Sequence, residues 1–374
     1  MRKSQSIAVL LFVLIFCFSA FSQTPIQTPP PLPEDDGEII KVDSRLIVVP
    51  VSVTDGNGQP VKGLGVEHFR VLEESKQQEI AEVSDAEKIP LEIAILFDIS
   101  GSTDPMFKFE QETAARFLQD VMRADDRATI FTIGERPLLI QNRNIAYRSI
   151  ETIRGIKPSK QFTAFYDTVS AAAKYLQLNA SPKSRKVILA ITDGEDTNSI
   201  GVKSAFSKVY QELGSRINSL TTKEYRETLV KKRNEIRQNE QSKSLLNLQN
   251  ADTVFYSINP AGSSYKLNKI SQFGQSNMQR FADETGGTAF LPKFLPIDLK
   301  SNYQNAANLQ QNTLTLKRIF DQLKNELQAQ YLVQYYSDGE FPPNRFVNVK
   351  VSVKLDLPQG KKVRARQGYF VKEQ

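Results

Sequence analysis

The alternation of apolar and polar positions separates a central region of the chain from its two flanks. From residue 91 onward, short apolar runs predict strands at 91–97, 127–133, 185–191, 252–258 and 288–291. The amphipathic stretches between and after them predict helices at 106–123, 164–178, 275–285 and 312–329. Near-continuous apolarity is typical of strands covered on both faces. We therefore predict an α/β fold with a doubly wound, mostly parallel sheet and right-handed crossovers.

The flanks carry a different pattern, with short runs of alternating and β-branched residues. These runs lie at 46–54, 69–72 and 80–83 before the central region, and at 331–336, 346–353 and 362–366 after it. Neither group is large enough to form a comfortable core alone. We expect the two groups to pair in one antiparallel β-sandwich, with the α/β domain inserted between them.

Residues 201–250 interrupt the strand–helix rhythm. They are polar, rich in helix formers, and contain ten Lys or Arg and five Glu. We predict a helical, basic insertion that projects from the end of the sheet; the alternative is a solvated charged helix with no further role. The net charge of +6 is concentrated here, so the chain as a whole is not a nucleic-acid binder.

The first residues are typical of a secretory signal. Arg2 and Lys3 precede an apolar stretch at 7–18, and a small-x-small site ends at Ser22. The apolar stretch is short for a membrane span, so we expect membrane association only if the signal is uncleaved. The single cysteine, Cys17, lies inside it, so the mature chain would be a secreted or periplasmic protein without disulfides.

The expected organisation follows from these patterns: a signal peptide at 1–22, a proline-rich linker at 23–38, an N-terminal β segment at 39–88, the α/β domain at 89–295 with its insertion at 201–250, and a helix with C-terminal strands at 296–374.

Oxygen-bearing side chains follow or precede several predicted elements. Asp98, Ser100 and Ser102 come directly after the strand at 91–97, Thr163 precedes a helix, and Asp193 follows the strand at 185–191. In a parallel sheet such loops gather at the carboxyl-end edge. Hard oxygen donors without His or Cys suit Mg²⁺. We therefore predict a metal site formed by Asp98, Ser100, Ser102, Thr163 and Asp193.

This set, D-x-S-x-S at 98–102 with Thr163 and Asp193-Gly194, resembles the metal-ion-dependent adhesion site of the von Willebrand factor A (VWFA) domain family. The resemblance covers roughly residues 90–295. The segments V-K-G-L at 61–64 and R-A-R-Q-G-Y at 364–369 resemble the bacterial exported subgroup. The insertion at 201–250 departs from the family, which usually has a shorter helical connection there.

The resemblance implies the role of each site residue. Ser100 and Ser102 would contact the metal directly, Thr163 would do so when a ligand is bound, and Asp98 and Asp193 would act largely through water. The cation would be Mg²⁺, or alternatively Mn²⁺ or Ca²⁺. Its open position would accept the carboxylate of an Asp or Glu from a partner protein.

Each site residue also has a simpler interpretation. Ser100 and Ser102 are good helix caps, Asp98 could cap the end of its strand by accepting backbone N–H groups, and Thr192-Asp193-Gly194 is an ordinary turn signal. Asp167, Glu195 and Asp196 are interpreted as acids near the site and not as ligands.

Enzyme chemistry has little support in the sequence. The single histidine, His68, lies in the N-terminal β segment, and neither a nucleophile-elbow nor a phosphate-binding loop motif is present. We expect no enzyme, no small-molecule substrate and no nucleic acid, but an exported metal-dependent adhesion or protein-binding module. The alternatives are a structural cell-envelope scaffold with a stabilising metal, and a metal-assisted hydrolase with Asp167 or Glu195 as general base.

Overall fold

The structure, a computed structural model, describes residues 45–85, 88–100, 104–159, 162–181, 183–215, 219–260, 269–297, 299–354 and 360–371. The signal peptide expected at 1–22 and the linker expected at 23–38 lie outside these residues. Within the described ranges, no helix combines the length and the apolar character that crossing a membrane requires.

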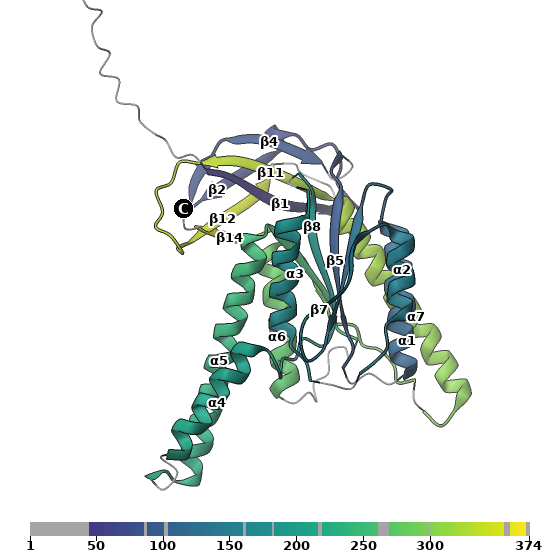
Figure 1. The fold of residues 1–374 in the computed structure, drawn as a ribbon. Coiled ribbons are helices and arrows are strands. Elements are labelled where there is room, and N and C mark those ends of the chain that lie inside the picture. The colour runs from purple at the N-terminus through teal and green to yellow at the C-terminus, as the bar shows by residue number, and fades with distance from the viewer. Residues whose placement is uncertain are drawn as a thin grey trace, which may run out of the picture. The chain divides into compact units, whose positions relative to one another are not determined.

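In the described part of the chain, six strands form a mixed sheet in the order β10-β9-β8-β5-β6-β7 (Figure 1). They are β5 (Leu91–Asp98), β6 (Arg127–Ile133), β7 (Leu138–Asn144), β8 (Arg185–Ile191), β9 (Thr253–Ile258) and β10 (Ala289–Phe290). All neighbours pair in parallel except β7, which is antiparallel to β6 at one edge. Every residue of β5 is buried, which fits a central strand with helices on both faces.

Helices cover both faces of this sheet (Figure 1). They include α1 (Asp104–Val121), α2 (Ala146–Gly155), α3 (Phe165–Asn179), α6 (Lys269–Thr285) and α7 (Asn302–Gln328). On one face, α3 and α6 pack in a core with Ala94 and Leu96 of β5. On the other, α1, α2 and α7 pack in a core with Ile93 and Ile95. Since alternate strand residues point to opposite faces, one apolar run serves both cores.

The sequence analysis missed β7 and α2, for physical reasons. The residues of β7 are mostly exposed, so this edge strand lacks the apolar run that marks the others. The buried residues of α2 are Ser149 and Ile153, and so narrow an apolar face gives a weak helical period.

Two antiparallel sheets pair the strands before the α/β region with those after it. Their orders in the described residues are β13-β1-β11-β4 and β14-β12-β2-β3. The strands are β1 (Arg45–Asp55), β2 (Phe69–Glu73), β3 (Lys76–Gln78), β4 (Ile80–Asp85), β11 (Gln330–Ser337), β12 (Phe346–Val353), β13 (Lys361–Ala365) and β14 (Gly368–Phe370). β1 lies between β11 and β13, and both sheets contribute to one apolar core that includes Val49, Val71 and Val349. The N-terminal and C-terminal strands therefore pair, as expected.

Between β8 and β9 the chain forms α4 (Ile200–Ser215) and α5 (Thr222–Asn250), which we name the helical arm. Figure 1 shows α4 and the first part of α5 extending beyond the sheet. A capping box starts α5: Thr221 Oγ1 accepts the N–H of Glu224 at 3.2 Å, and the Glu224 carboxylate accepts the N–H of Thr221 at 2.8 Å. The last turns of α5 bury Leu245 and Leu248 in the core beside α3, so the arm is rooted in the fold.

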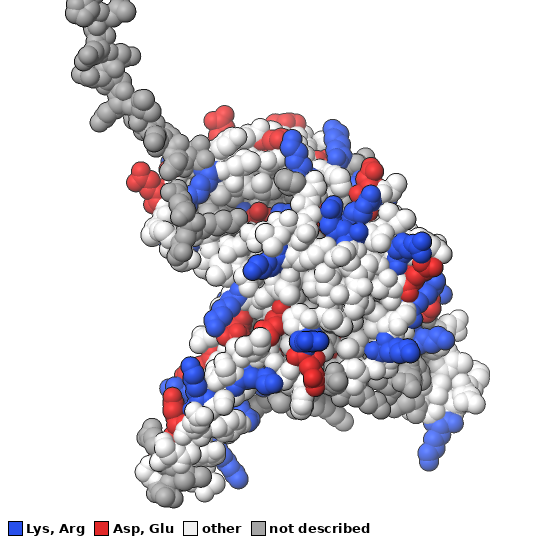
Figure 2. Space-filling view, viewed as in Figure 1, with Lys and Arg blue, Asp and Glu red and all other residues white. Residues whose placement is uncertain are grey.

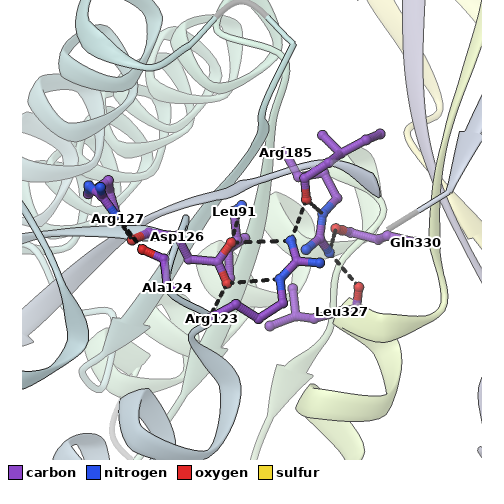
Figure 3. Close-up of polar contacts among 9 residues, drawn as sticks. Leu91, Arg123, Ala124, Asp126, Arg127, Arg185, Leu327 and Gln330 are labelled. Carbon is purple, nitrogen blue, oxygen red and sulfur yellow. Dashed lines mark hydrogen bonds and ion pairs between the residues drawn. The ribbon is translucent and has the colours of Figure 1, made fainter. Parts of the chain in front are cut away.

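A buried polar network joins the sheet to the sandwich at the amino ends of the strands (Figure 3). The Asp126 carboxylate accepts the N–H groups of Leu91 and Arg123, each at 2.7 Å. Arg185, the first residue of β8, donates to the carbonyl oxygen of Leu327 at 2.6 Å. Because Leu327 lies in the last turn of α7, just before β11, this contact links the α/β region to the sandwich.

Candidate metal centre

Asp98 is the last residue of β5, and hydrogen bonds hold its carboxylate at the carboxyl-end edge of the sheet. Its side chain is buried. Oδ1 accepts the N–H of Ser100 at 2.9 Å and the Ser100 hydroxyl at 2.7 Å. Oδ2 accepts the Thr192 hydroxyl at 2.6 Å. The loops after β5 and β8 therefore meet at this one side chain.

Thr163 reaches the same point from the loop before α3. Its hydroxyl donates to Ser100 Oγ at 3.2 Å, and its side chain is buried. Thr163, Ser100 and Asp98 thus form a continuous chain of hydrogen bonds between two separate loops. Ser102 lies outside the described residues, and its contribution to the site stays a prediction.

Asp193 sits in the turn that follows β8, next to Thr192. Its Oδ1 accepts the N–H of Glu195 at 2.9 Å, while Thr192 Oγ1 accepts the N–H of Gly194 at 3.1 Å. Gly194 has a φ of 74°, a left-handed conformation that favours glycine. The turn therefore orients Asp193 through backbone contacts, and Thr192 connects it to Asp98.

Asp196 fastens the loop after β8 to the start of α3. Its carboxylate accepts the N–H of Tyr166 at 2.9 Å, the N–H of Ser199 at 3.1 Å and the Ser199 hydroxyl at 2.5 Å. The carbonyl oxygen of Thr163 accepts the N–H groups of Thr197 and Asn198, each at 2.9 Å. Asp196 is a buried positioning residue for the Thr163 loop, and the sequence had marked it only as a nearby acid.

The site is a place where negative charge is costly. Burial raises the pKa of Asp98, although hydrogen bonds from Thr192 and Ser100 oppose that rise. Burial and the Asp98 charge raise the pKa of Asp193 to about 7. The charge of Glu195 adds to the rise for both Asp98 and Asp193.

Glu110 is a third acid near this site, and the sequence analysis missed it. It is 5% exposed, and its Oε1 has no hydrogen-bond partner among the described residues. Burial, with the charges of Asp98 and Asp193, raises its pKa to about 8. The sequence signal was an acid on the buried face of α1, between Phe107 and Ala114.

These residues fit a hard divalent cation. In the described part of the chain, no lysine or arginine forms an ion pair with Asp98, Glu110 or Asp193. A buried carboxyl group without a cationic side chain either keeps its proton or has its charge offset by a metal ion. No group of three or more His, Cys, Asp or Glu in the described residues is arranged to hold a metal. The hydroxyls of Ser100 and Thr163 would therefore supply part of any coordination.

Exposed apolar residues border this edge of the sheet. Phe162, which precedes Thr163, is 64% exposed, and Ile200, the first residue of α4, is 77% exposed. The N–H of Ile200 donates to the Asp167 carboxylate at 2.9 Å, which fixes the base of the helical arm beside α3. Large apolar side chains this exposed are available for contact with a partner.

His68 has a local structural contact in the sandwich. It ends the short 3₁₀ helix η1 (Val66–His68), where its Nδ1 accepts the N–H of Gly65 at 2.9 Å. These contacts do not place His68 beside Ser100, as a serine–histidine active site would require.

No protein-family model matches this chain, and no curated protein matches it. Solved structures do match. An aerotolerance-related membrane protein from Bacteroides fragilis is 13% identical with a TM-score of 0.33, over 61% of this chain and 99% of that one. Proximal thread matrix protein 1 from the mussel byssus, with a zinc-occupied MIDAS motif, is 12% identical with a TM-score of 0.41, over 68% of this chain and 50% of that one. The PilB minor pilin from Streptococcus sanguinis is 13% identical with a TM-score of 0.37, over 64% of this chain and 62% of that one. The mixed sheet with flanking antiparallel sheets is compatible with a VWFA-like fold, and any functional assignment rests on the residues of this chain.

Proposed function

We propose that this chain is an exported, metal-dependent protein-binding module of the VWFA type. A divalent cation, Mg²⁺ or alternatively Mn²⁺ or Ca²⁺, is held by Asp98, Ser100, Ser102, Thr163 and Asp193. When bound, it supplies an open coordination position for the carboxylate of an Asp or Glu on a partner protein. The export signal expected at 1–22 places the module in the periplasm or outside the cell.

The hydrogen-bond chain from Thr163 through Ser100 to Asp98 carries this proposal. It brings hydroxyl and carboxylate oxygens from separate loops within 3.2 Å of each other. Such oxygens are the ligands that Mg²⁺ prefers. The nearby carboxyls of Asp193 and Glu110 would ionise beside a bound cation, so this edge suits a cation and not an anion.

The surroundings support a macromolecular partner. Phe162 and Ile200 provide exposed apolar contacts beside the polar centre. The helical arm begins at the same edge and carries the basic surplus of the sequence, although the face in Figure 2 shows both signs of charge on it. A surplus of positive charge would accelerate the approach of an acidic partner.

A structural scaffold is the second candidate, because a cation beside buried acids stabilises the fold whether or not a partner binds. The two functions differ in one respect. A scaffold needs the metal for stability alone, whereas a binding module also loses its partner when the metal is removed.

Calorimetric titration of Mg²⁺ and Mn²⁺ into the purified chain tests the metal site, with Asp98→Ala as the variant and the exposed Asp120→Ala as its matched control. We expect binding by the parent and by Asp120→Ala, and none by Asp98→Ala. Absence of binding by the parent would overturn the site.

Affinity capture from cell-envelope extracts tests the partner function. We expect the parent to capture partner proteins in Mg²⁺ but not in EDTA. We also expect the Phe162→Ser variant to capture less of them in Mg²⁺. Capture that is unaffected by EDTA, together with a melting temperature that falls in EDTA, would favour the scaffold.

A further inference from the structure

A cavity of about 300 Å³ lies where the sandwich meets the end of the helical arm. Its walls come from the start of β1, the last turn of α5 and the residues around β14, and they include Arg45, Ile47, Gln249, Asp252, Arg366 and Tyr369. These residues belong to none of the loops that form the metal centre. The volume is at the lower end of the range for small-molecule sites.

Gln249 lines this cavity, and its side chain is buried. It is 3% exposed, and neither its Oε1 nor its Nε2 has a hydrogen-bond partner among the described residues. Buried polar atoms are almost always paired, because leaving them unpaired costs stability. A buried donor and acceptor without a partner in the protein are groups that a bound ligand could satisfy after a small rotation of the side chain.

Two guanidinium groups lie on the same walls. Arg366 is 4% exposed; its Nη1 donates to Asp252 Oδ1 at 2.7 Å, and its guanidinium carbon lies 5.9 Å from the centre of the Tyr369 ring. Its Nε, and Nη1 of Arg45, are buried without a hydrogen-bond partner among the described residues. With Asp252 offsetting one arginine, the charged lining residues leave one positive charge, which matches a monoanion.

Apart from Asn250, the rest of the lining is apolar. Ile47, Val48 and Val371 contribute aliphatic surface, and Phe370 adds an aromatic ring. An apolar wall with a few convergent polar groups is the usual composition of a small-molecule site. The unpaired arginine donors would bind a carboxylate, the Gln249 amide would bind a neighbouring hydroxyl, and the apolar wall would cover a short hydrocarbon body.

We propose that this cavity binds a small hydroxy-monocarboxylate through Arg45, Arg366 and Gln249, independently of the metal centre. The sequence analysis expected no small-molecule substrate. It had no means of finding this site, because the three side chains come from positions 45, 249 and 366 and only the fold places them on one cavity.

Calorimetric titration of mandelate into the full chain tests this proposal, since mandelate combines a carboxylate, an adjacent hydroxyl and an apolar ring. We expect saturable binding with a Kd of about 1 mM or tighter. The neutral mandelamide should bind at least about tenfold more weakly, because it lacks the charge that the arginines recognise.

Two variants and two controls assign the site. Gln249→Leu and Arg45→Gln should each weaken mandelate binding by about tenfold or more. Gln249→Leu should also keep or raise the melting temperature, since it removes unpaired polar atoms. Arg45→Gln gives an independent readout if Gln249→Leu fails to fold.

Two control variants separate this site from the rest of the molecule. The exposed Arg148→Gln on α2 should leave mandelate binding unchanged. Ser100→Ala should bind mandelate as the parent does, so that failure of the metal centre and failure of this site are distinguishable. Equal binding of mandelate and mandelamide, no binding, or undiminished binding by Gln249→Leu would overturn the proposal.

Discussion

Gly194, in the turn after β8, and Gly274, in α6, touch through their backbones. A Cβ atom on Gly194 would lie 2.5 Å from the carbonyl oxygen of Gly274, and one on Gly274 would lie 2.6 Å from the carbonyl oxygen of Asp193. Helix α6 therefore packs directly against the turn that carries Asp193. The hydrogen bond from Asn277 Nδ2 to the Gly194 carbonyl oxygen, at 3.2 Å, adds to the same contact.

Gly274→Ala is expected to displace the Asp193 turn, because the new methyl group would meet backbone atoms that cannot move aside. We expect a lower melting temperature and a Mg²⁺ affinity reduced by about tenfold or more. Calorimetry and thermal unfolding measure the two effects. Gly214→Ala in α4 is the matched control, since its Cβ would meet nothing within 4 Å among the described residues. Unchanged metal affinity in Gly274→Ala would show that the turn does not depend on α6.

Asp196→Asn is expected to loosen the Thr163 loop without removing any proposed ligand. The carboxylate accepts hydrogen bonds from Tyr166 and Ser199, and an amide NH₂ group would face one of these donors. The loss should be about 1–3 kcal/mol in the free energy of unfolding, with a weaker metal affinity. Urea unfolding measures the first and calorimetry the second. Asp120→Asn, on the exposed side of α1, should leave both unchanged.

Stability without metal is expected to fall as the pH rises. The pKa of Asp193 is raised to about 7 and that of Glu110 to about 8, whereas both groups titrate near pH 4 in the unfolded chain. The folded state therefore retains protons that the unfolded state has lost. Its stability is highest below about pH 4 with respect to these groups, and is lost as the pH rises through about 8.

Thermal unfolding in EDTA at pH 5, 6.5 and 8 checks this expectation. The melting temperature should decrease along the series, and Glu110→Gln should flatten the decrease because it removes one of the titrating groups. Added Mg²⁺ should stabilise the parent more at pH 8 than at pH 5, since it interacts with ionised carboxylates. An equally steep decrease in Glu110→Gln would contradict the role assigned to Glu110.

Arg185→Met tests whether fold stability and metal affinity are separable. Burial lowers the pKa of Arg185 to about 10, and its loss would leave the Leu327 carbonyl oxygen without this donor. We expect a cost of about 3 kcal/mol in the free energy of unfolding. Metal affinity should not change, because Arg185 begins β8 at the edge opposite to Asp193. Arg116→Met, on an exposed position of α1, should stay within about 0.5 kcal/mol of the parent.

The apolar runs were enough to predict the parallel strands of the central sheet, because β5 and β8 are buried on both faces and their composition follows directly from that. The long helix α7 shows the limit of such patterns. Its expected start was 312, but it begins at Asn302. Asn312 is 1% exposed, and its amide bonds both the N–H and the carbonyl oxygen of Leu295, at 2.7 and 2.8 Å. A polar side chain buried by pairing with a distant backbone does not appear in an apolar period.

In the candidate site, too, some residues could be predicted from the sequence and others could not. Asp98, Ser100 and Thr163 follow from their positions at strand and helix ends, which topology gathers at one edge. Thr192 was interpreted as part of a turn, yet its hydroxyl bonds Asp98 at 2.6 Å. Glu110 shares the apolar face of α1 with Phe107 and Ala114, which signals burial, but the acids whose charges act on it come from other loops. Such residues acquire their roles from neighbours that only the folded chain supplies.

The place of β1 between β11 and β13 has a consequence for the order in which this chain can fold during synthesis. Residues 45–55 are synthesised before the central region, but the strands that flank them in the sheet are residues 330–337 and 361–365. The segment from β5 to β10, in contrast, contains every neighbour that its own sheet requires. The central sheet can therefore assemble while the sandwich waits for residues nearly three hundred positions later. A chain truncated before β11 would keep β1 as an unpaired apolar strand, the kind of segment that chaperones and proteases recognise.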